Sequence, residues 1–230
     1  MTYWDMVEKY GLYFLLGLYP KGPLGGLALT LVLASAGLLL AMPLGLLLGL
    51  GRVSHWPALR WPVTALVFVV RGTPLLMVIF WMYFLLPIIM GKTTPESQTV
   101  IMGLTLFTSA YMSQIVRAGI EGIPKGQTEA ALSTGLKPWQ AMFYVVLPQG
   151  LRNMIPSFVN QFVSLIKDTS LAFIVGVSEL THVGTQINNR TMAFPTEIFI
   201  FIAFVYFIIC YAFTSLSRVL ERRLSWSKSI

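Results

Sequence analysis

Residues 24–50 read LGGLALTLVLASAGLLLAMPLGLLLGL and contain no charged side chain. About 20 consecutive apolar residues are enough for a helix to cross the hydrocarbon core of a bilayer, so this segment predicts a transmembrane helix. The rest of the chain has the same character, because 56% of its 230 residues are hydrophobic and only 11% are charged. A soluble domain carries about 25% charged residues. The composition therefore excludes a water-soluble enzyme, a disordered segment and a nucleic-acid-binding module.

Four further apolar stretches follow this segment, separated by more polar residues. Together they predict an all-α polytopic membrane protein with about five transmembrane helices. Residues 4–20 are aromatic but short for a span, and we expect them to form a helix in the membrane interface. The expected spans are residues 24–50, 57–90, 99–118, 155–177 and 195–216, with a turn at 51–57 and loops at 91–98 and 178–194.

The stretch 57–90 is too long for one straight span, because at 1.5 Å per residue it would measure about 50 Å against about 30 Å of hydrocarbon. The polar interruption near its middle is Arg71-Gly72-Thr73-Pro74. Pro74 removes a helical hydrogen bond, so we predict a kink or a break at this point.

Basic residues are unevenly distributed between the two sides of the predicted membrane protein, whose formal net charge is +7. Because Lys and Arg are retained in cytoplasmic loops, the bias predicts an outer N-terminus and a cytoplasmic C-terminus. One side holds Arg52, Arg60, Arg117, Lys125, Lys137, Arg152, Arg218, Arg222, Arg223 and Lys228, and the other side holds Lys9, Lys21, Lys92 and Arg190.

The glycines, the cysteine and the histidines of the chain bear on helix packing, disulfide formation and metal binding. Gly45 and Gly49 are four residues apart, so they either admit a close neighbouring helix or are ordinary glycines of a lipid-facing helix. Cys210 is the only cysteine, and His55 and His182 lie far apart in the sequence, so we predict neither a disulfide nor a metal site. The sequence also lacks a catalytic triad and a glycine-rich nucleotide loop, so we expect no catalytic residue in this chain.

A polar, basic stretch of about 30 residues, 119–152, joins two expected spans, although most connections are 2–8 residues long. Glu129-Ala130-Ala131-Leu132 favours a helix, Gly135 can end it in a left-handed conformation, and Pro138 can begin the next helix, which we expect to run to Leu147-Pro148. Two short helices in the cytoplasm can dock into a groove on a soluble partner.

The same residues resemble the EAA loop of ABC importer permeases. Glu129-Ala130-Ala131 is followed after three residues by Gly135, and after nine more by Val145-Val146-Leu147-Pro148, with Val145 where isoleucine is common. The resemblance implies a type I ABC importer (MetI-like) permease architecture, in which the loop at 121–150 enters the cleft of an ATP-hydrolysing subunit. The coupling residues it implies are Glu129, Ala130, Ala131, Gly135, Leu147 and Pro148.

Three further segments are similar to signatures of the permeases for polar amino acids, the histidine/glutamine/glutamate group. They are Arg71-Gly72-Thr73-Pro74-Leu75-Leu76, Lys167-Asp168-Thr169-Ser170-Leu171, and Tyr111–Ile120 with Arg117-Ala118-Gly119. The resemblance covers residues 24–222, the expected permease domain. Residues 1–23 precede it as a periplasmic or interfacial segment, and residues 223–230 follow as a cytoplasmic tail.

Polar residues also line one face of the expected span 155–177. Asn160, Ser164 and Asp168 fall at i, i+4 and i+8, and Lys167 and Asp168 lie near the middle of the span, where an exposed charge costs about 3 kcal/mol. These charges either contact the substrate or pair with neighbouring helices. Arg71 can bind an ionic group at the predicted break or pair structurally, and Arg117 and Glu121 are spaced as an i,i+4 ion pair. The pathway candidates are Asn160, Gln161, Ser164, Lys167, Asp168, Thr169, Ser170, Arg71 and Thr73.

The resemblance implies a transmembrane permease subunit of an ATP-driven, binding-protein-dependent importer in a bacterial inner membrane, moving polar L-amino acids by alternating access, with glutamate and aspartate slightly favoured. It implies two ATPase subunits, a second permease copy or paralogue, and a periplasmic amino-acid-binding protein as partners. No cofactor is expected on this chain, since ATP and Mg²⁺ would bind to the ATPase. The alternatives are a stand-alone secondary transporter or channel, a membrane-embedded enzyme, or the same importer with glutamine or a basic amino acid as substrate.

Overall fold

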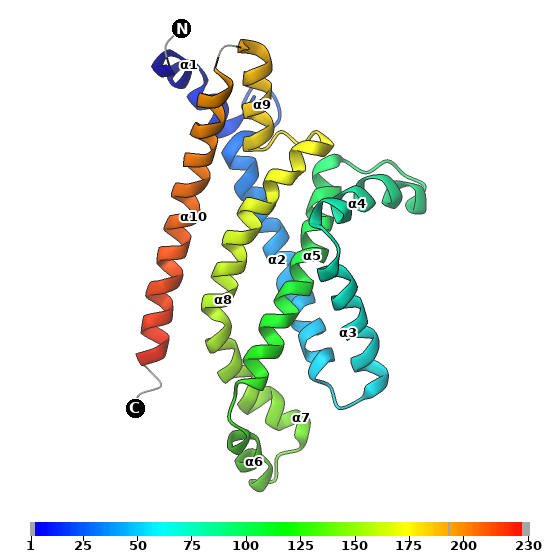
Figure 1. Cartoon of the computed structure of the whole chain (residues 1–230). Coiled ribbons are helices and arrows are strands. Elements are labelled where there is room, and N and C mark those ends of the chain that lie inside the picture. The colour runs from blue at the N-terminus through cyan, green and yellow to red at the C-terminus, as the bar shows by residue number, and fades with distance from the viewer. Residues whose placement is uncertain (1–2, 193, 227–230) are drawn as a thin grey trace.

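Four long helices form the body of the protein and run between its two ends in the computed structural model, which describes residues 3–192 and 194–226 (Figure 1). They are α2 (Gly26–Val53), α5 (Glu96–Glu121), α8 (Leu147–Asp168) and α10 (Pro195–Trp226). Each belongs to a helical segment that is long and apolar enough to cross a membrane. The described residues contain no β-strand, which confirms the all-α prediction.

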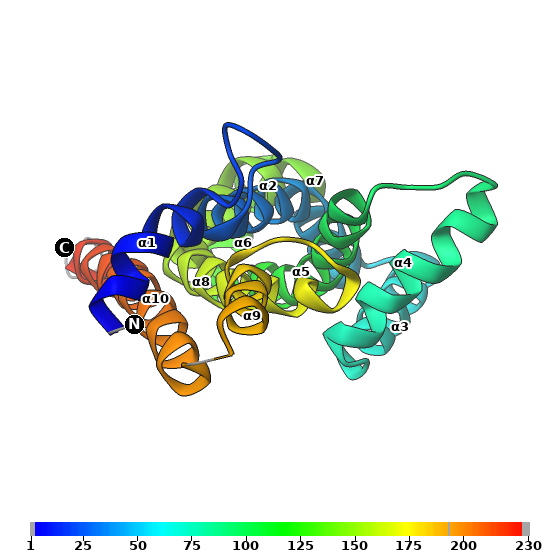
Figure 2. The ribbon, with the colours of Figure 1, turned by 90° about the horizontal axis from the view of Figure 1, so that it is seen from above.

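Shorter helices cap both ends of this body. At one end lie α1 (Tyr3–Leu16) and α9 (Leu180–Thr191), and at the other end lie α6 (Lys125–Ser133) and α7 (Pro138–Ala141) (Figure 1). Seen from above, α10 lies on one side of the central helices and α3 (Pro57–Gly72) and α4 (Leu75–Met90) project on the other (Figure 2). A helix therefore forms within residues 4–20 as expected, whereas its place in the membrane interface stays a prediction.

The helices α2 and α5 pack against each other along a row of small residues. An added Cβ at Gly45 would lie 2.5 Å from the Cβ of Met112, and one at Gly49 would lie 2.5 Å from the Cβ of Val116. Real Cβ atoms do not approach so closely, so only glycine allows this backbone separation. Of the two interpretations of Gly45 and Gly49, the structure supports close helix packing.

The apolar stretch 57–90 breaks where the sequence predicts. The axes of α3 and α4 meet at 103°, far more than a proline kink inside one helix. Thr73 is extended, at φ −95° and ψ 135°, because the ring of Pro74 disfavours a helical conformation for the preceding residue. The described residues contain four candidate spans by length and composition, or five if the α3–α4 pair counts as one broken span.

The connection into α8 differs from the prediction of a separate second helix followed by a span from residue 155. The chain is helical without interruption from Pro138 to Val175, through a π-helical segment η1 (Met142–Val146), α8 and a 3₁₀ segment η2 (Thr169–Val175). Pro148 lies in the first turn of α8, directly after the π-helical turn. The wider π-helical turn leaves room for the proline ring and for the hydrogen bond that is missing at Pro148. The proline therefore does not end the helix.

The segment 178–194 was predicted as a loop, and this prediction was wrong for most of its length. It contains α9, whose N-cap is Glu179. The carboxylate of Glu179 accepts hydrogen bonds from the backbone N–H groups of Thr181 and His182, at 2.9 and 2.8 Å. Such capping satisfies the N–H groups that the first turn of a helix leaves free. The predicted tail 223–230 is helical to Trp226, and residues 227–230, with Lys228, lie outside the described residues.

Candidate functional site

The coupling loop, residues 121–150, protrudes from the end of the bundle opposite α1 and α9 (Figure 1). The helix α6 ends at Ser133, and Gly135 two residues later has a φ of 89°, in the left-handed region. The N–H of Leu136 donates to the carbonyl of Ala131 at 3.3 Å, and the N–H of Gly135 donates to that of Leu132 at 3.0 Å. These two bonds form the Schellman motif that a glycine in this position allows, and they turn the chain sharply from α6 toward α7.

The surface of the coupling loop combines an exposed acid with exposed large apolar side chains. Glu129 and Ala130 are exposed, whereas Ala131 is buried against the rest of the loop. Monomeric proteins seldom leave several large apolar groups uncovered on a polar segment, so this surface has the character of a contact surface. The exposed apolar side chains are Leu132, Trp139, Phe143 and Tyr144.

The coupling loop is firmly connected to the membrane helices. Val146 and Leu147 are buried together with Val116 and Ile120 of α5 and Met154 of α8. Leu147 is therefore a core residue, whereas the neighbouring Pro148 is exposed. These contacts join the coupling loop to both α5 and α8 through close-packed side chains.

The helix α8 carries an exposed polar stripe along one face. Asn160 and Lys167 are exposed, and Ser164 and Asp168 are half-buried on the same face. Lys167 and Asp168 are the last two residues of α8, and the nearby Leu165 packs against Gly37 of α2. Among the described side chains, neither Lys167 nor Asp168 forms an ion pair with a residue of another helix.

The polar stripe is longer than the sequence analysis proposed. Ser157 and Asn153 are exposed one and two turns before Asn160 on the same face. With Gln114 of α5 they line a pocket of about 440 Å³ at the lower end of α8. The spacing 153, 157, 160, 164 marks them, but Asn153 lies before residue 155, where the predicted span begins.

The remaining pathway candidates lie outside this stripe or have hydroxyl groups that are already bonded. Thr169 is buried and its hydroxyl donates to the carbonyl of Ile166 at 2.7 Å. Gln161 and Ser170 are half-buried. The guanidinium carbon of Arg71 stands 5.0 Å from the ring centre of Tyr111 on α5, a cation–π contact. Thr73 donates its hydroxyl to the carbonyl of Val69 at 2.9 Å, within its own helix.

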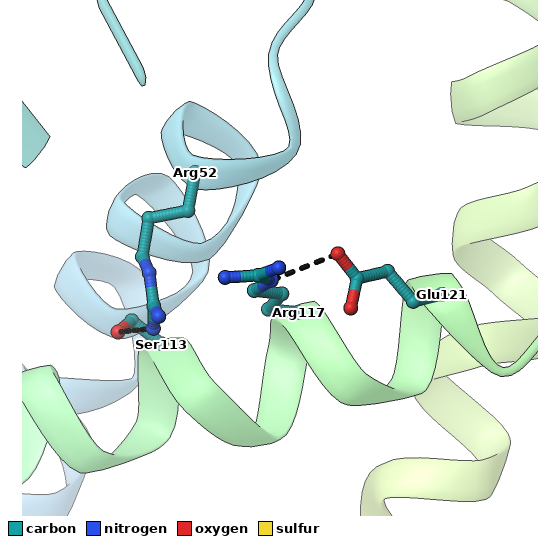
Figure 3. Close-up of polar contacts among 4 residues, drawn as sticks. All are labelled: Arg52, Ser113, Arg117 and Glu121. Carbon is teal, nitrogen blue, oxygen red and sulfur yellow. Dashed lines mark hydrogen bonds and ion pairs between the residues drawn. The ribbon is translucent and has the colours of Figure 1, made fainter. Parts of the chain in front are cut away.

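A group of charged residues lies where α2 and α5 end near the coupling loop (Figure 3). Arg117 and Glu121 form the predicted i,i+4 ion pair at 2.8 Å. Beside them Arg52 is buried, and its Nη1 donates to the hydroxyl of Ser113 at 3.2 Å. Among the described side chains, no three of the His, Cys, Asp and Glu residues gather as a metal site.

Glu179 lies at the end of the bundle formed by α1 and α9, and it connects α9 with α10 and α2. The sequence did not predict this role. Its side chain is fully buried and accepts a hydrogen bond from the hydroxyl of Tyr206 on α10 at 3.0 Å, besides capping α9. Its backbone pairs with Gly26 at the start of α2. Glu179 lies outside the candidate spans, and burial raises the pKa of its carboxyl to about 7 although the hydrogen bonds from Thr181, His182 and Tyr206 lower it.

Comparison with known proteins places this arrangement in a family. Residues 41–226 match the family described as "Binding-protein-dependent transport system inner membrane component". The chain is 37% identical to the inner membrane amino-acid ABC transporter permease protein YhdY of Escherichia coli (strain K12), over all of this chain and 63% of YhdY. It is 40% identical to the probable glutamine ABC transporter permease protein GlnP of Bacillus subtilis (strain 168), over 86% of this chain and 91% of GlnP.

A solved structure supports the same assignment. The fold matches the crystal structure of an amino acid ABC transporter with histidines at a TM-score of 0.84 and 29% identity, over 97% of this chain and 99% of that chain. These relatives are permease subunits, the pore-forming membrane components of transporters whose ATP hydrolysis takes place on a separate subunit. The chain therefore belongs to the inner membrane components of binding-protein-dependent transport systems, and within them to the amino-acid ABC transporter permeases.

Proposed function

We propose that the protein imports polar L-amino acids as the permease subunit of an ATP-driven, binding-protein-dependent transporter. The observation that carries the proposal is the coupling loop, which exposes Glu129 and several large apolar side chains and is packed rigidly onto α5 and α8. Two ATPase subunits, which bind ATP and Mg²⁺, receive two such loops. An amino-acid-binding protein delivers the substrate at the end formed by α1 and α9, on the periplasmic side.

A second copy of the chain, or a close paralogue, completes the pathway. The polar stripe of α8 is uncovered in the single chain, and a charge left facing lipid costs about 3 kcal/mol or more. Pairing two permeases across this face would enclose the stripes around a water-filled route. Asn160, Ser164, Lys167 and Asp168 then bind the ammonium and carboxylate groups of the substrate, since the stripe offers both signs of charge.

Transport proceeds by alternating access. Closure of the ATPase pair on ATP pushes the coupling loop, and the buried contacts of Val146 and Leu147 with Val116 and Ile120 pass the displacement to α5. The helices rock to open the midplane site toward the binding protein, and ATP hydrolysis returns them to the cytoplasm-facing state.

The substrate within this class is a separate question. We favour glutamate and aspartate slightly, on overall resemblance alone, and the two cations Arg71 and Lys167 beside the one anion Asp168 are only compatible with an anionic substrate. Relatives are named for different substrates, among them a probable glutamine permease of Bacillus subtilis and the glutamate/aspartate import permease protein GltK of Escherichia coli, the latter 32% identical over 87% of this chain. Glutamine and basic amino acids are therefore the rivals within the class.

Reconstitution in proteoliposomes tests the proposal. The chain is combined with its ATPase and binding-protein partners, and uptake of glutamate, aspartate, glutamine, histidine and arginine is measured with and without ATP. We expect uptake that requires all components and ATP. ATP-independent uptake by the chain alone would instead identify a secondary transporter or channel.

A further inference from the structure

A basic cavity of about 940 Å³ opens between the end of α2, the start of α3, the end of α5 and the coupling loop. Four cationic side chains line it, and the only acid in its lining is Glu121, which already pairs with Arg117. The cavity therefore carries a positive charge that the described side chains lining it do not balance. The cations are Arg52, Arg60, Arg117 and Lys125.

Arg52 is the residue of this group whose hydrogen bonding is incomplete. Only 8% of it is exposed, its Nη1 donates to Ser113, and its buried Nε has no hydrogen-bond partner in the part of the chain that the structure describes. The acid beside it, Glu121, is already paired with Arg117 (Figure 3). A buried guanidinium without a carboxylate is costly unless an anion reaches it, and its planar donors suit phosphate and carboxylate oxygens.

An apolar groove of about 730 Å³ adjoins the basic cavity. The two share Val53, Ser54 and His55 of the α2–α3 turn and Pro138 and Met142 of the coupling loop. The rest of the groove is almost entirely aliphatic and aromatic. Its lining includes Leu47, Leu50, Leu59, Trp56, Trp139 and Phe143. Cavity and groove together fit a molecule with an anionic head and an apolar tail, and such molecules are abundant in membranes.

The position along the membrane normal agrees with a lipid headgroup. The α2–α3 turn follows a helix of 28 residues, which is about 42 Å long and so reaches beyond the hydrocarbon core. Trp56 and Trp61 are 76% and 68% exposed beside the cavity, and tryptophan is typical of the headgroup layer. Under the orientation of the proposed function, this is the cytoplasmic leaflet, whose anionic lipids are drawn to basic pockets between helices.

We propose that the protein binds an anionic phospholipid here, with the phosphate at Arg52, Arg60 and Lys125 and an acyl chain along the membrane-helix side of the groove, formed by Leu47, Leu50, Trp56 and Leu59. The coupling-loop side chains Trp139 and Phe143 remain part of the surface that contacts the ATPase. A soluble anion such as the transported amino acid has no acyl chain that could fill the apolar groove. The pocket below the polar stripe of α8, with Gln114 and Asn153, shares no lining residue with the basic cavity. The lipid site is therefore separate from the transport route.

Native mass spectrometry of the full-length protein tests this proposal with phosphatidylglycerol and with phosphatidylcholine of the same acyl chains. We expect tighter binding of phosphatidylglycerol and a loss of about fivefold for each cavity charge removed, since a basic residue near an anionic membrane is worth a factor of this size. Arg60→Gln with Lys125→Gln changes only exposed cations, so it reads out binding even if Arg52→Gln fails to fold. Arg218→Gln, an exposed cation on α10, is the matched control and should bind as the wild type does.

Competition distinguishes the lipid from other anions. Glycerol 3-phosphate and glutamate, which have an anionic group but no acyl chain, should not displace phosphatidylglycerol. Displacement by either would make the cavity a soluble-anion site and overturn the lipid assignment. Equal binding of both lipids, or equal loss in Arg218→Gln, would overturn it as well. None of these outcomes depends on uptake, so failure here leaves the proposed transport function untouched.

Discussion

Replacing Glu179 with glutamine should remove a pH dependence from the stability of the protein. Burial raises the pKa of this carboxyl from its ordinary value of 4.5 to about 7. One pKa unit corresponds to about 1.4 kcal/mol, so ionising Glu179 in the folded state costs about 3 kcal/mol relative to the unfolded chain. The residue is fully buried, so solvent does not screen this cost.

The sign follows from which state holds the proton more tightly. Between about pH 4.5 and pH 7 the folded protein keeps a proton on Glu179 that the unfolded chain has released, so stability falls as the pH rises through this window. Above about pH 7 Glu179 is ionised in both the folded and the unfolded state, and the loss of stability is complete. For a chain of this size, 3 kcal/mol corresponds to roughly 6–12 °C in melting temperature.

The assay is thermal unfolding of the purified protein in detergent at closely spaced values from pH 5 to pH 8. Glu179→Gln loses part of the hydrogen bonding to Thr181, His182 and Tyr206, so its melting temperature will be lower at acidic pH, but it should not fall further with rising pH. Glu96→Gln, which removes an exposed carboxyl, should keep the wild-type fall. An unchanged slope in Glu179→Gln would refute the assignment of the pH dependence to this residue.

Three further predictions concern packing and the coupling loop. Gly49→Ala should destabilise the protein by about 1–3 kcal/mol and lower its melting temperature, because the added Cβ would overlap Val116. Gly72→Ala should leave the melting temperature unchanged, since a Cβ at Gly72 would have no neighbour within 4 Å. Equal effects of the two substitutions would argue against the tight α2–α5 contact. Gly135→Ala should lower the folding stability by about 1–2 kcal/mol, because alanine is strained at this left-handed φ, and should also lower ATP-driven uptake. Gly126→Ala, inside α6, should leave uptake intact. Normal uptake by Gly135→Ala would show that the sharp turn is dispensable. Breaking the exposed Arg117–Glu121 pair by Glu121→Gln should change stability by less than about 0.5 kcal/mol in chemical denaturation, and a loss of several kcal/mol would contradict its exposed character.

Hydrophobic patterning was sufficient to predict the membrane helices. The uncharged residues 24–50 became α2, and Pro74 marked the α3–α4 break, because a long apolar run and a missing backbone N–H have local consequences. The size of that bend, 103°, could not be predicted, since it depends on how α4 packs on α5. Pro148 misled the analysis, because a π-helical turn upstream accommodates a proline that would otherwise end a helix.

The candidate site was predictable where one helix or one loop defines it. Gly135 adopts the left-handed conformation expected of it, and the polar face of α8 follows from its 3.6-residue period. Glu179 and Arg52 could not be found in this way. Each owes its role to burial between segments that are far apart in sequence, as with Glu179 and Tyr206 or Arg52 and Ser113, and no local pattern marks such contacts.

The central claim is that the coupling loop transmits work from an ATPase to the membrane helices, and charge reversal at Glu129 tests it most directly. ATP-driven amino acid uptake is measured in proteoliposomes containing the assembled transporter, for Glu129→Lys and for Glu221→Lys, an exposed acid near the end of α10. We predict at least a tenfold loss of uptake for Glu129→Lys and near-normal uptake for Glu221→Lys. Uptake that survives reversal at Glu129, or that continues without ATP, would contradict the claim.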